Sequence, residues 1–172
     1  VRKGLSRRAG MRYEALVKQR ITGPLGMGST SITLTADQKA RLEKGRDASL
    51  RPVANWDFQD ATAGAGALRS DADDILTFLE AELGFGPSPL AGAMQAQLKP
   101  RRPTGIPNTV IALARHITTT PQGPIVWHNG GAGGYRSIIA FHILAGTPPV
   151  QPPKPSVEHH EIQVDADVEI LE

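Results

Sequence analysis

The sequence predicts a mixed α+β domain in which helices flank an antiparallel sheet. Apolar residues recur at helical spacing within residues 11–22, and a capped apolar stripe runs through residues 70–83. Three β-prone stretches follow at 109–120, 124–128 and 135–141. Apolar residues make up 40% and charged residues 21% of the 172 residues, which is typical of a soluble globular domain, alone or with a tail.

The composition excludes several classes of function. The formal net charge is only +2, so nucleic acid and anionic membranes are not expected partners. There is no cysteine, which excludes disulfides, thiolate nucleophiles and Cys-ligated metals. No run approaches the roughly 18–20 apolar residues of a membrane span, and the basic start "VRKGLSRRAGM" lacks the apolar stretch of a signal peptide. We expect no cofactor and no metal.

The first helix is predicted from the spacing of Tyr13, Leu16, Val17 and Ile21, and the following Gly-Pro pair is expected to end it. Residues 35–47 are charged and predict a second, short helix. Residues 50–70 contain Pro, Asn, Asp and two Gly and are expected to be irregular. Another short helix is predicted around residues 90–98.

The clearest helix begins at Ser70, which we predict to be its N-cap, with Asp73 at the capping-box position. Asp71, Asp73 and Asp74 lie in the first turn, where negative charge opposes the positive end of the helix dipole. Gly84 is expected to end the helix. This acidic cluster therefore has a structural explanation, and we favour that over a metal or catalytic role.

The stretch "VWHNGGAGGYRS", residues 126–137, joins two of the β-prone segments, while "PQG" between the other two predicts a hairpin. Its four glycines do not fit a nucleotide-binding loop, because Arg136 stands where the last Gly of G-x-G-x-x-G belongs and no Lys-Ser/Thr follows. A structural tight turn is an equally good interpretation of the glycines taken alone.

Three stretches resemble one known family. "HNGGAGGY", preceded by "TTPQGPIVW", resembles the third active-site element of the serine β-lactamase/penicillin-binding-protein superfamily, in the class C-like branch with esterases and D-aminopeptidases, where a His often replaces the Lys of Lys-Thr-Gly. "MRYEALVKQRITGPLGMGSTS" and "AGAGALRSDADDILTFLEAELG" resemble two further segments of that family, in the same order. The resemblance covers roughly residues 1–141 and implies an incomplete β-lactamase/transpeptidase-like fold.

The resemblance implies a site along this stretch. His128 would point into the pocket as the catalytic residue, and Asn129, Gly130, Gly131 and Tyr135 would bind substrate. Gly130 would keep a side chain out of the substrate's path, and a backbone N–H near the position after Gly131 would contribute to an oxyanion hole. The alternatives are a structural His on a hairpin and a packing role for Tyr135.

Two motifs of the family do not occur in this sequence. The residue three places after each of the eight serines is never Lys, so Ser-x-x-Lys is absent, and neither Tyr-x-Asn nor Ser-x-Asn occurs. We therefore interpret the chain as the C-terminal part of a periplasmic or secreted serine hydrolase, acting on a β-lactam, D-amino-acid peptide or ester. The alternatives are a non-catalytic peptide- or partner-binding module and a remnant without selected function.

The predicted organisation is a hydrolase part over residues 1–146, a Pro-rich linker over 147–156, and the start of a truncated β domain over 157–172. The pair His159-His160 resembles a metal site only superficially, because neighbouring residues on a strand face opposite sides. Relatives usually have a further strand after "SIIAF", but "HILAGTPP" follows here. We therefore expect an exposed sheet edge, through which the chain could associate.

Overall fold

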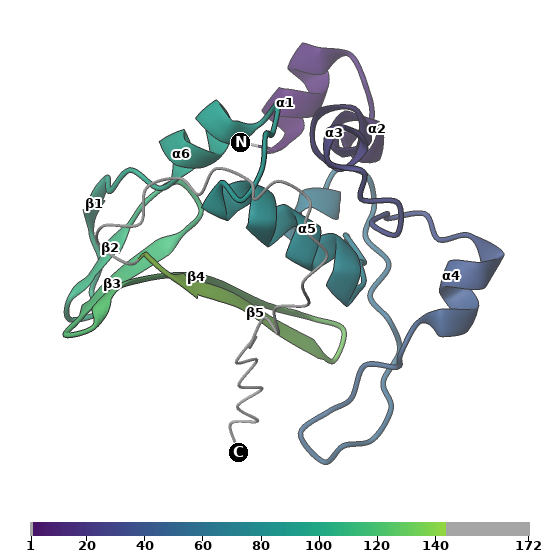
Figure 1. Cartoon of the computed structure of the whole chain (residues 1–172). Coiled ribbons are helices and arrows are strands. Elements are labelled where there is room, and N and C mark those ends of the chain that lie inside the picture. The colour runs from purple at the N-terminus through teal and green to yellow at the C-terminus, as the bar shows by residue number, and fades with distance from the viewer. Residues whose placement is uncertain (1, 144–172) are drawn as a thin grey trace, which may run out of the picture.

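In the computed structural model, which describes residues 2–143, helices pack on one face of an antiparallel sheet (Figure 1). The sheet has five strands in the order β1-β2-β3-β4-β5, so each strand pairs with its neighbour in sequence. The mixed α+β prediction is confirmed. The strands are β1 (Arg102–Pro103), β2 (Thr109–Ile111), β3 (His116–Thr120), β4 (Gly123–Ala132) and β5 (Tyr135–His142).

The helical elements precede the sheet in the chain. They are α1 (Arg2–Ala9), α2 (Tyr13–Val17), the π-helix η1 (Lys18–Thr22), α3 (Gly23–Leu25), α4 (Ala36–Arg41), the 3₁₀-helix η2 (Ala63–Ala65), α5 (Ala72–Leu83) and α6 (Ala91–Gln97). The helix predicted at 11–22 continues beyond the Gly-Pro pair, because Pro24 falls in the first turn of α3, where proline is tolerated. It ends instead at Gly26, which is left-handed. The helix predicted at 35–47 is shorter than expected and ends at Arg41.

The hydrophobic core lies between the sheet and the helices. Val126 of β4 is fully buried, and Ile117 of β3 and Ala112 are nearly so. Leu98, Val110 and Phe141 pack against this cluster. Figure 1 shows α5 lying across the same face of β4 and β5, and it shows no helix of the described residues on the opposite face.

Two strand predictions need correction. The stretch 109–120 is two strands rather than one, because the chain turns at residues 112–115 to bury Ala112 in the core and to bring Arg115 to an acidic partner on α5. The glycine run is mostly strand rather than loop, since β4 continues to Ala132. Only Gly133 and Gly134 form the turn, with φ of +54° and +80°, values that favour glycine.

Helix α5 begins one residue later than predicted, with Asp71 rather than Ser70 as its N-cap. The Asp71 carboxylate accepts the backbone N–H of Asp74 at 3.0 Å. Ser70 instead lies with its hydroxyl 2.6 Å from that of Thr30. Gly84 ends the helix in the left-handed conformation, as predicted.

Within residues 2–143, no helix combines the length and apolarity that crossing a membrane requires. The predicted linker, the predicted β segment at 157–172 and the pair His159-His160 lie outside the described residues.

Candidate active site

The candidate site begins where β4 extends beyond its neighbour β3. Strand β3 pairs with β4 only from Gly123 to Trp127, whereas β5 pairs with β4 as far as Ala132. From His128 onward, therefore, one edge of β4 has no partner strand among the described residues. This open edge carries the stretch singled out in the sequence.

The register shows which backbone groups face the open edge. The Ile143 N–H donates to the Pro124 carbonyl at 2.9 Å, so the even-numbered residues of β4 bond to β5 and the odd-numbered residues face β3. Trp127, opposite His116, is the last odd-numbered residue that β3 covers. The next two, Asn129 and Gly131, direct their backbone N–H and C=O groups toward open space.

The side chains of β4 alternate between the two faces of the sheet. His128 and Gly130 share the face of buried Val126, which is the face covered by α5. Ala132 continues the same row, and a Cβ placed on Gly66 would lie 3.4 Å from the Ala132 Cβ. The row therefore runs from the core toward the segment that precedes α5, and the exposed His128 imidazole lies on it.

The surroundings of His128 favour its neutral form. Partial burial lowers the pKa of His128, and the positive charges of Arg115 and His116 lower it further. The His116 ring lies 6.3 Å from the His128 ring and nearly parallel to it, while stacking on Trp127 at 4.4 Å. At neutral pH this imidazole is therefore uncharged, and it can both donate and accept a hydrogen bond.

A buried ion pair fixes the position of Arg115. Its Nε and Nη2 donate to Glu82 of α5 at 2.9 and 2.7 Å, and both side chains are almost fully buried. The Gln97 side chain of α6 donates to the same carboxylate at 2.8 Å. The turn before β3 is thus tied to the C-terminal end of α5, and this tie keeps a cation close to His128.

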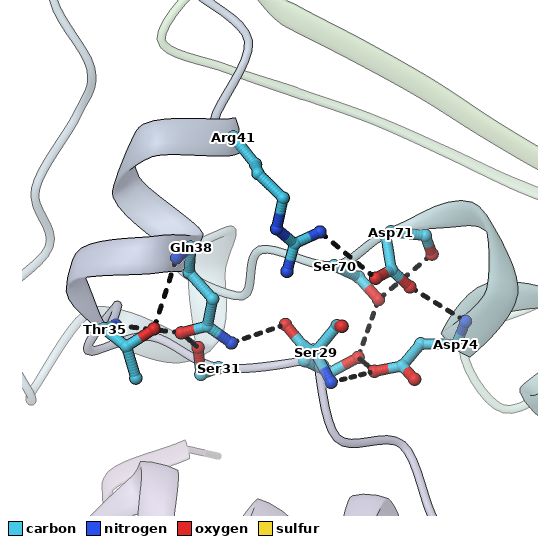
Figure 2. A network of polar contacts seen from close by, with 9 residues as sticks. Ser29, Ser31, Thr35, Gln38, Arg41, Ser70, Asp71 and Asp74 are labelled. Carbon is cyan, nitrogen blue, oxygen red and sulfur yellow. Dashed lines mark hydrogen bonds and ion pairs between the residues drawn. The ribbon is translucent and has the colours of Figure 1, made fainter.

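At its other end, α5 is tied to the segment that follows α3 (Figure 2). The Ser29 backbone N–H donates to Asp74 at 2.9 Å, and the Thr30 hydroxyl donates to the same carboxylate oxygen at 2.6 Å. A capping box between Thr35 and Gln38 begins α4, and the Gln38 side chain reaches back to the Ser29 carbonyl. The acidic cluster therefore has the structural role that we predicted. No group of three or more potential metal ligands occurs within residues 2–143.

The tip of the β4–β5 hairpin packs against residues 43–58. The Arg46 N–H donates to the Gly134 carbonyl at 3.0 Å. The Tyr135 hydroxyl lies 2.5 Å from the Glu43 carbonyl and 2.7 Å from the Asn55 side-chain oxygen. A Cβ on Gly134 would lie 2.4 Å from Val53, so this contact requires glycine. The segment forms a wall beyond the end of the open edge.

The structure thus gathers His128, Asn129, Gly130 and Gly131 on one exposed stretch of β4. Tyr135 lies on the paired strand, where its hydroxyl is engaged by the wall just described. Sequence reasoning missed Arg115 and His116, because their proximity to His128 depends on the sharp turn between β2 and β3. In the sequence, the only signal for this turn was a charged residue, Arg115, inside an otherwise β-prone stretch.

The antiparallel sheet with helices on one face is a β-lactamase-like fold. The His128 imidazole lies beside the open edge of strand β4 in this fold. The family model described as Beta-lactamase matches residues 2–143, and the chain therefore belongs to the beta-lactamase family. No curated protein sequence matches the chain.

Solved structures share this fold at low sequence identity. A Beta-Lactamase/D-Alanine Carboxypeptidase from Pseudomonas syringae has a TM-score of 0.70 at 20% identity, covering 80% of this chain and 47% of the other. A class C beta lactamase from Rhodobacter sphaeroides has a TM-score of 0.70 at 21% identity, with coverages of 80% and 47%. For D-alanine Carboxypeptidase AmpC from Burkholderia cenocepacia the values are 0.69, 18%, 80% and 48%. The chain spans slightly less than half the length of these proteins.

Proposed function

We propose that the chain is part of a serine hydrolase of the β-lactamase, D-Ala-peptidase or esterase type, acting through an acyl-enzyme whose nucleophile lies outside these 172 residues. The observation that supports this most strongly is the open edge of β4 beside His128. An extended acyl substrate can pair with such an edge as an added strand. The edge and the imidazole then hold the substrate from two sides.

Each residue of the edge has a separate proposed role. The Gly131 N–H is directed away from β5 and stabilises the oxyanion of the tetrahedral intermediate, while the Asn129 backbone pairs with the substrate. Gly130 shares the face of His128 and leaves room for the substrate because it has no side chain. Neutral His128 hydrogen-bonds to the substrate near its carboxylate or the oxyanion. Tyr135 contributes to the rim.

The proposed substrates are β-lactams, D-amino-acid peptides and short esters. Membership of the family supports the first two, since solved relatives are described as β-lactamases and D-alanine carboxypeptidases. A periplasmic or secreted location follows from the same proposal.

Binding to the open edge is tested by titrating the ¹⁵N-labelled chain with a peptide ending in D-alanyl-D-alanine. We expect chemical-shift changes at the Asn129 and Gly131 amides and at the His128 ring. His128→Ala should weaken them, whereas His142→Ala, at the other end of the hairpin, is the matched control. Changes confined to other parts of the chain would rule out this site.

Catalysis is tested separately with nitrocefin and p-nitrophenyl acetate. The isolated chain should hydrolyse neither above a boiled control, because no described hydroxyl is activated by a Lys at helical spacing. Turnover by the 172 residues that phenylmethylsulfonyl fluoride abolishes would contradict the assignment of the nucleophile to another segment.

A non-catalytic binding module is the second candidate function, and the absence of Ser-x-x-Lys from this sequence favours it. Such a module would use the same strand edge to hold a peptidoglycan-like peptide or a partner protein. The coding sequence upstream of Val1 discriminates between the two functions. An in-frame Ser-x-x-Lys there supports the hydrolase, and a start codon without the motif supports the binding module.

A further inference from the structure

The outer edge of β5 is a second run of unpaired backbone, and it is longer than the edge at His128. Strand β5 is the last strand in the sheet order. Its odd-numbered residues bond to β4, so Arg136, Ile138, Ala140 and His142 direct their N–H and C=O groups outward. No hydrogen bond among the described residues uses these groups. An edge of this kind is a template for another extended strand.

Nothing in β5 blocks such pairing. The strand contains no Pro, Gly or Lys, the residues that commonly protect an edge. Ile138 is 57% exposed on the face of the sheet that no described helix covers, and Arg136 and His142 lie on the same face. Ile139 and Phe141 lie on the helix-covered face and are partly buried. A strand that completes this edge should therefore be apolar on one side and acidic on the other.

We infer that residues 161–171 of this chain, "EIQVDADVEIL", add to the outer edge of β5 as a further strand. These residues lie outside the described part of the structure, and their sequence has the required pattern. Apolar residues occupy every second position, at Ile162, Val164, Ala166, Val168 and Ile170. The four positions between them are amide or acidic residues, namely Gln163, Asp165, Asp167 and Glu169. Period-two alternation places the two sets on opposite faces.

Charge supports pairing within the chain. Residues 1–143 contain 18 basic and 11 acidic residues, a net charge of +7, whereas residues 144–172 contain one basic and six acidic residues, a net charge of −5. Placing the acidic set on the open face brings it beside Arg136. The apolar set then lies next to Ile139 and Phe141 and extends the core beneath the helices.

The connection is long enough. Residues 144–160 join β5 to the proposed strand, and at about 3.3 Å per residue they reach roughly 55 Å. The eight residues of β5 span only about 26 Å at the same rise. The segment can therefore return along the whole edge in either direction.

Residue-resolved amide hydrogen exchange on the full chain tests the inference. The outward amides of Arg136, Ile138 and Ala140 should exchange more slowly than free peptide by a factor of about ten or more. In the double variant Val164→Pro with Asp167→Pro they should lose this protection, because the two positions alternate along the strand and one of the two prolines removes a ladder donor to β5 in either strand direction. The inward amides of Ile139 and Phe141 report whether β5 itself remains folded, and Val150→Pro in the Pro-rich stretch is the matched control.

Three results would overturn the inference. The first is exchange of the outward amides at the free-peptide rate in the unmodified chain, and the second is protection that the proline pair leaves unchanged. The third is protection that disappears on dilution together with a dimer in sedimentation velocity, which would assign the edge to a second copy of the chain.

Discussion

The two ends of α5 are held by carboxylates of the same chemistry in different surroundings. At the C-terminal end, Glu82 is 1% exposed and pairs with Arg115, which is 7% exposed. At the N-terminal end, Asp74 is also buried, at 7% exposed, but Ser29 and Thr30, which donate hydrogen bonds to it, are only half-buried (Figure 2). If the carboxylate is removed, water can reach the half-buried donors at the second end but not the buried guanidinium at the first. Loss of a partner should therefore have very different consequences at the two ends.

The largest effect is expected from Glu82→Ala. The substitution leaves the Arg115 guanidinium buried without its counter-charge, which costs about 3–5 kcal/mol of the free energy of unfolding. Urea denaturation followed by circular dichroism measures the loss.

A double variant separates the charge from the packing. Glu82→Leu combined with Arg115→Met replaces the pair by apolar groups of similar size, and most of the lost stability should return. If the double variant is as unstable as Glu82→Ala, the stability of this end does not depend on an unpaired charge.

A smaller effect is expected at the other end from Asp74→Ala. This variant loses two hydrogen bonds to a charged acceptor. One such bond contributes about 1.5–3 kcal/mol, and because water can solvate the half-buried Ser29 and Thr30 donors, the total loss should be no larger than about 3 kcal/mol. Asp73→Ala is the matched control, since it removes the same charge from the first turn but its exposed carboxylate bonds to neither Ser29 nor Thr30. Equal destabilisation of the two variants in thermal unfolding would mean that the helix dipole, not the bonded segment, accounts for the effect.

The N-cap contributes less again. Asp71→Ala removes the acceptor for the Asp74 N–H and should lower the free energy of unfolding by less than Asp74→Ala does, as measured by thermal unfolding. The Arg41 contact at 3.9 Å adds little, because it is an exposed ion pair. Asp71→Ser should restore most of the loss, since serine is an equally good cap. A serine variant as unstable as the alanine variant would assign the cap's role to its charge alone.

Local signals predicted α5 well and its exact start less well. Gly84, the apolar stripe and the acidic first turn fixed its span because each acts within a few residues. Ser70 and Asp71 are both good caps, and the choice between them depends on Thr30, which lies 40 residues earlier and engages the Ser70 hydroxyl. Similarly, nothing near Arg115 announces Glu82, which lies 33 residues away in sequence.

The same distinction holds for the candidate site. The stretch around His128 was found from its own residues, because its motif is continuous. Its position at an open edge could not be predicted, since that depends on where β3 begins. Strand β3 begins at His116, opposite Trp127, only after a turn that the β-prone stretch 109–120 concealed.

The smallest expected effect connects the buried ion pair to the site. Because the pKa of His128 is lowered in the folded chain, the unfolded chain binds more protons at and below about pH 6.5. The free energy of unfolding should therefore fall as the pH drops through this value and level off below the folded-state pKa. His128→Gln should remove this component, whereas His142→Gln should leave it in place. In the Glu82→Leu, Arg115→Met variant, loss of the neighbouring cation should raise the pKa of His128 toward its usual value, as measured by NMR titration of the imidazole. An unchanged titration would mean that burial and His116 alone keep this imidazole neutral, so that the ion pair supports the fold without setting the charge of the site.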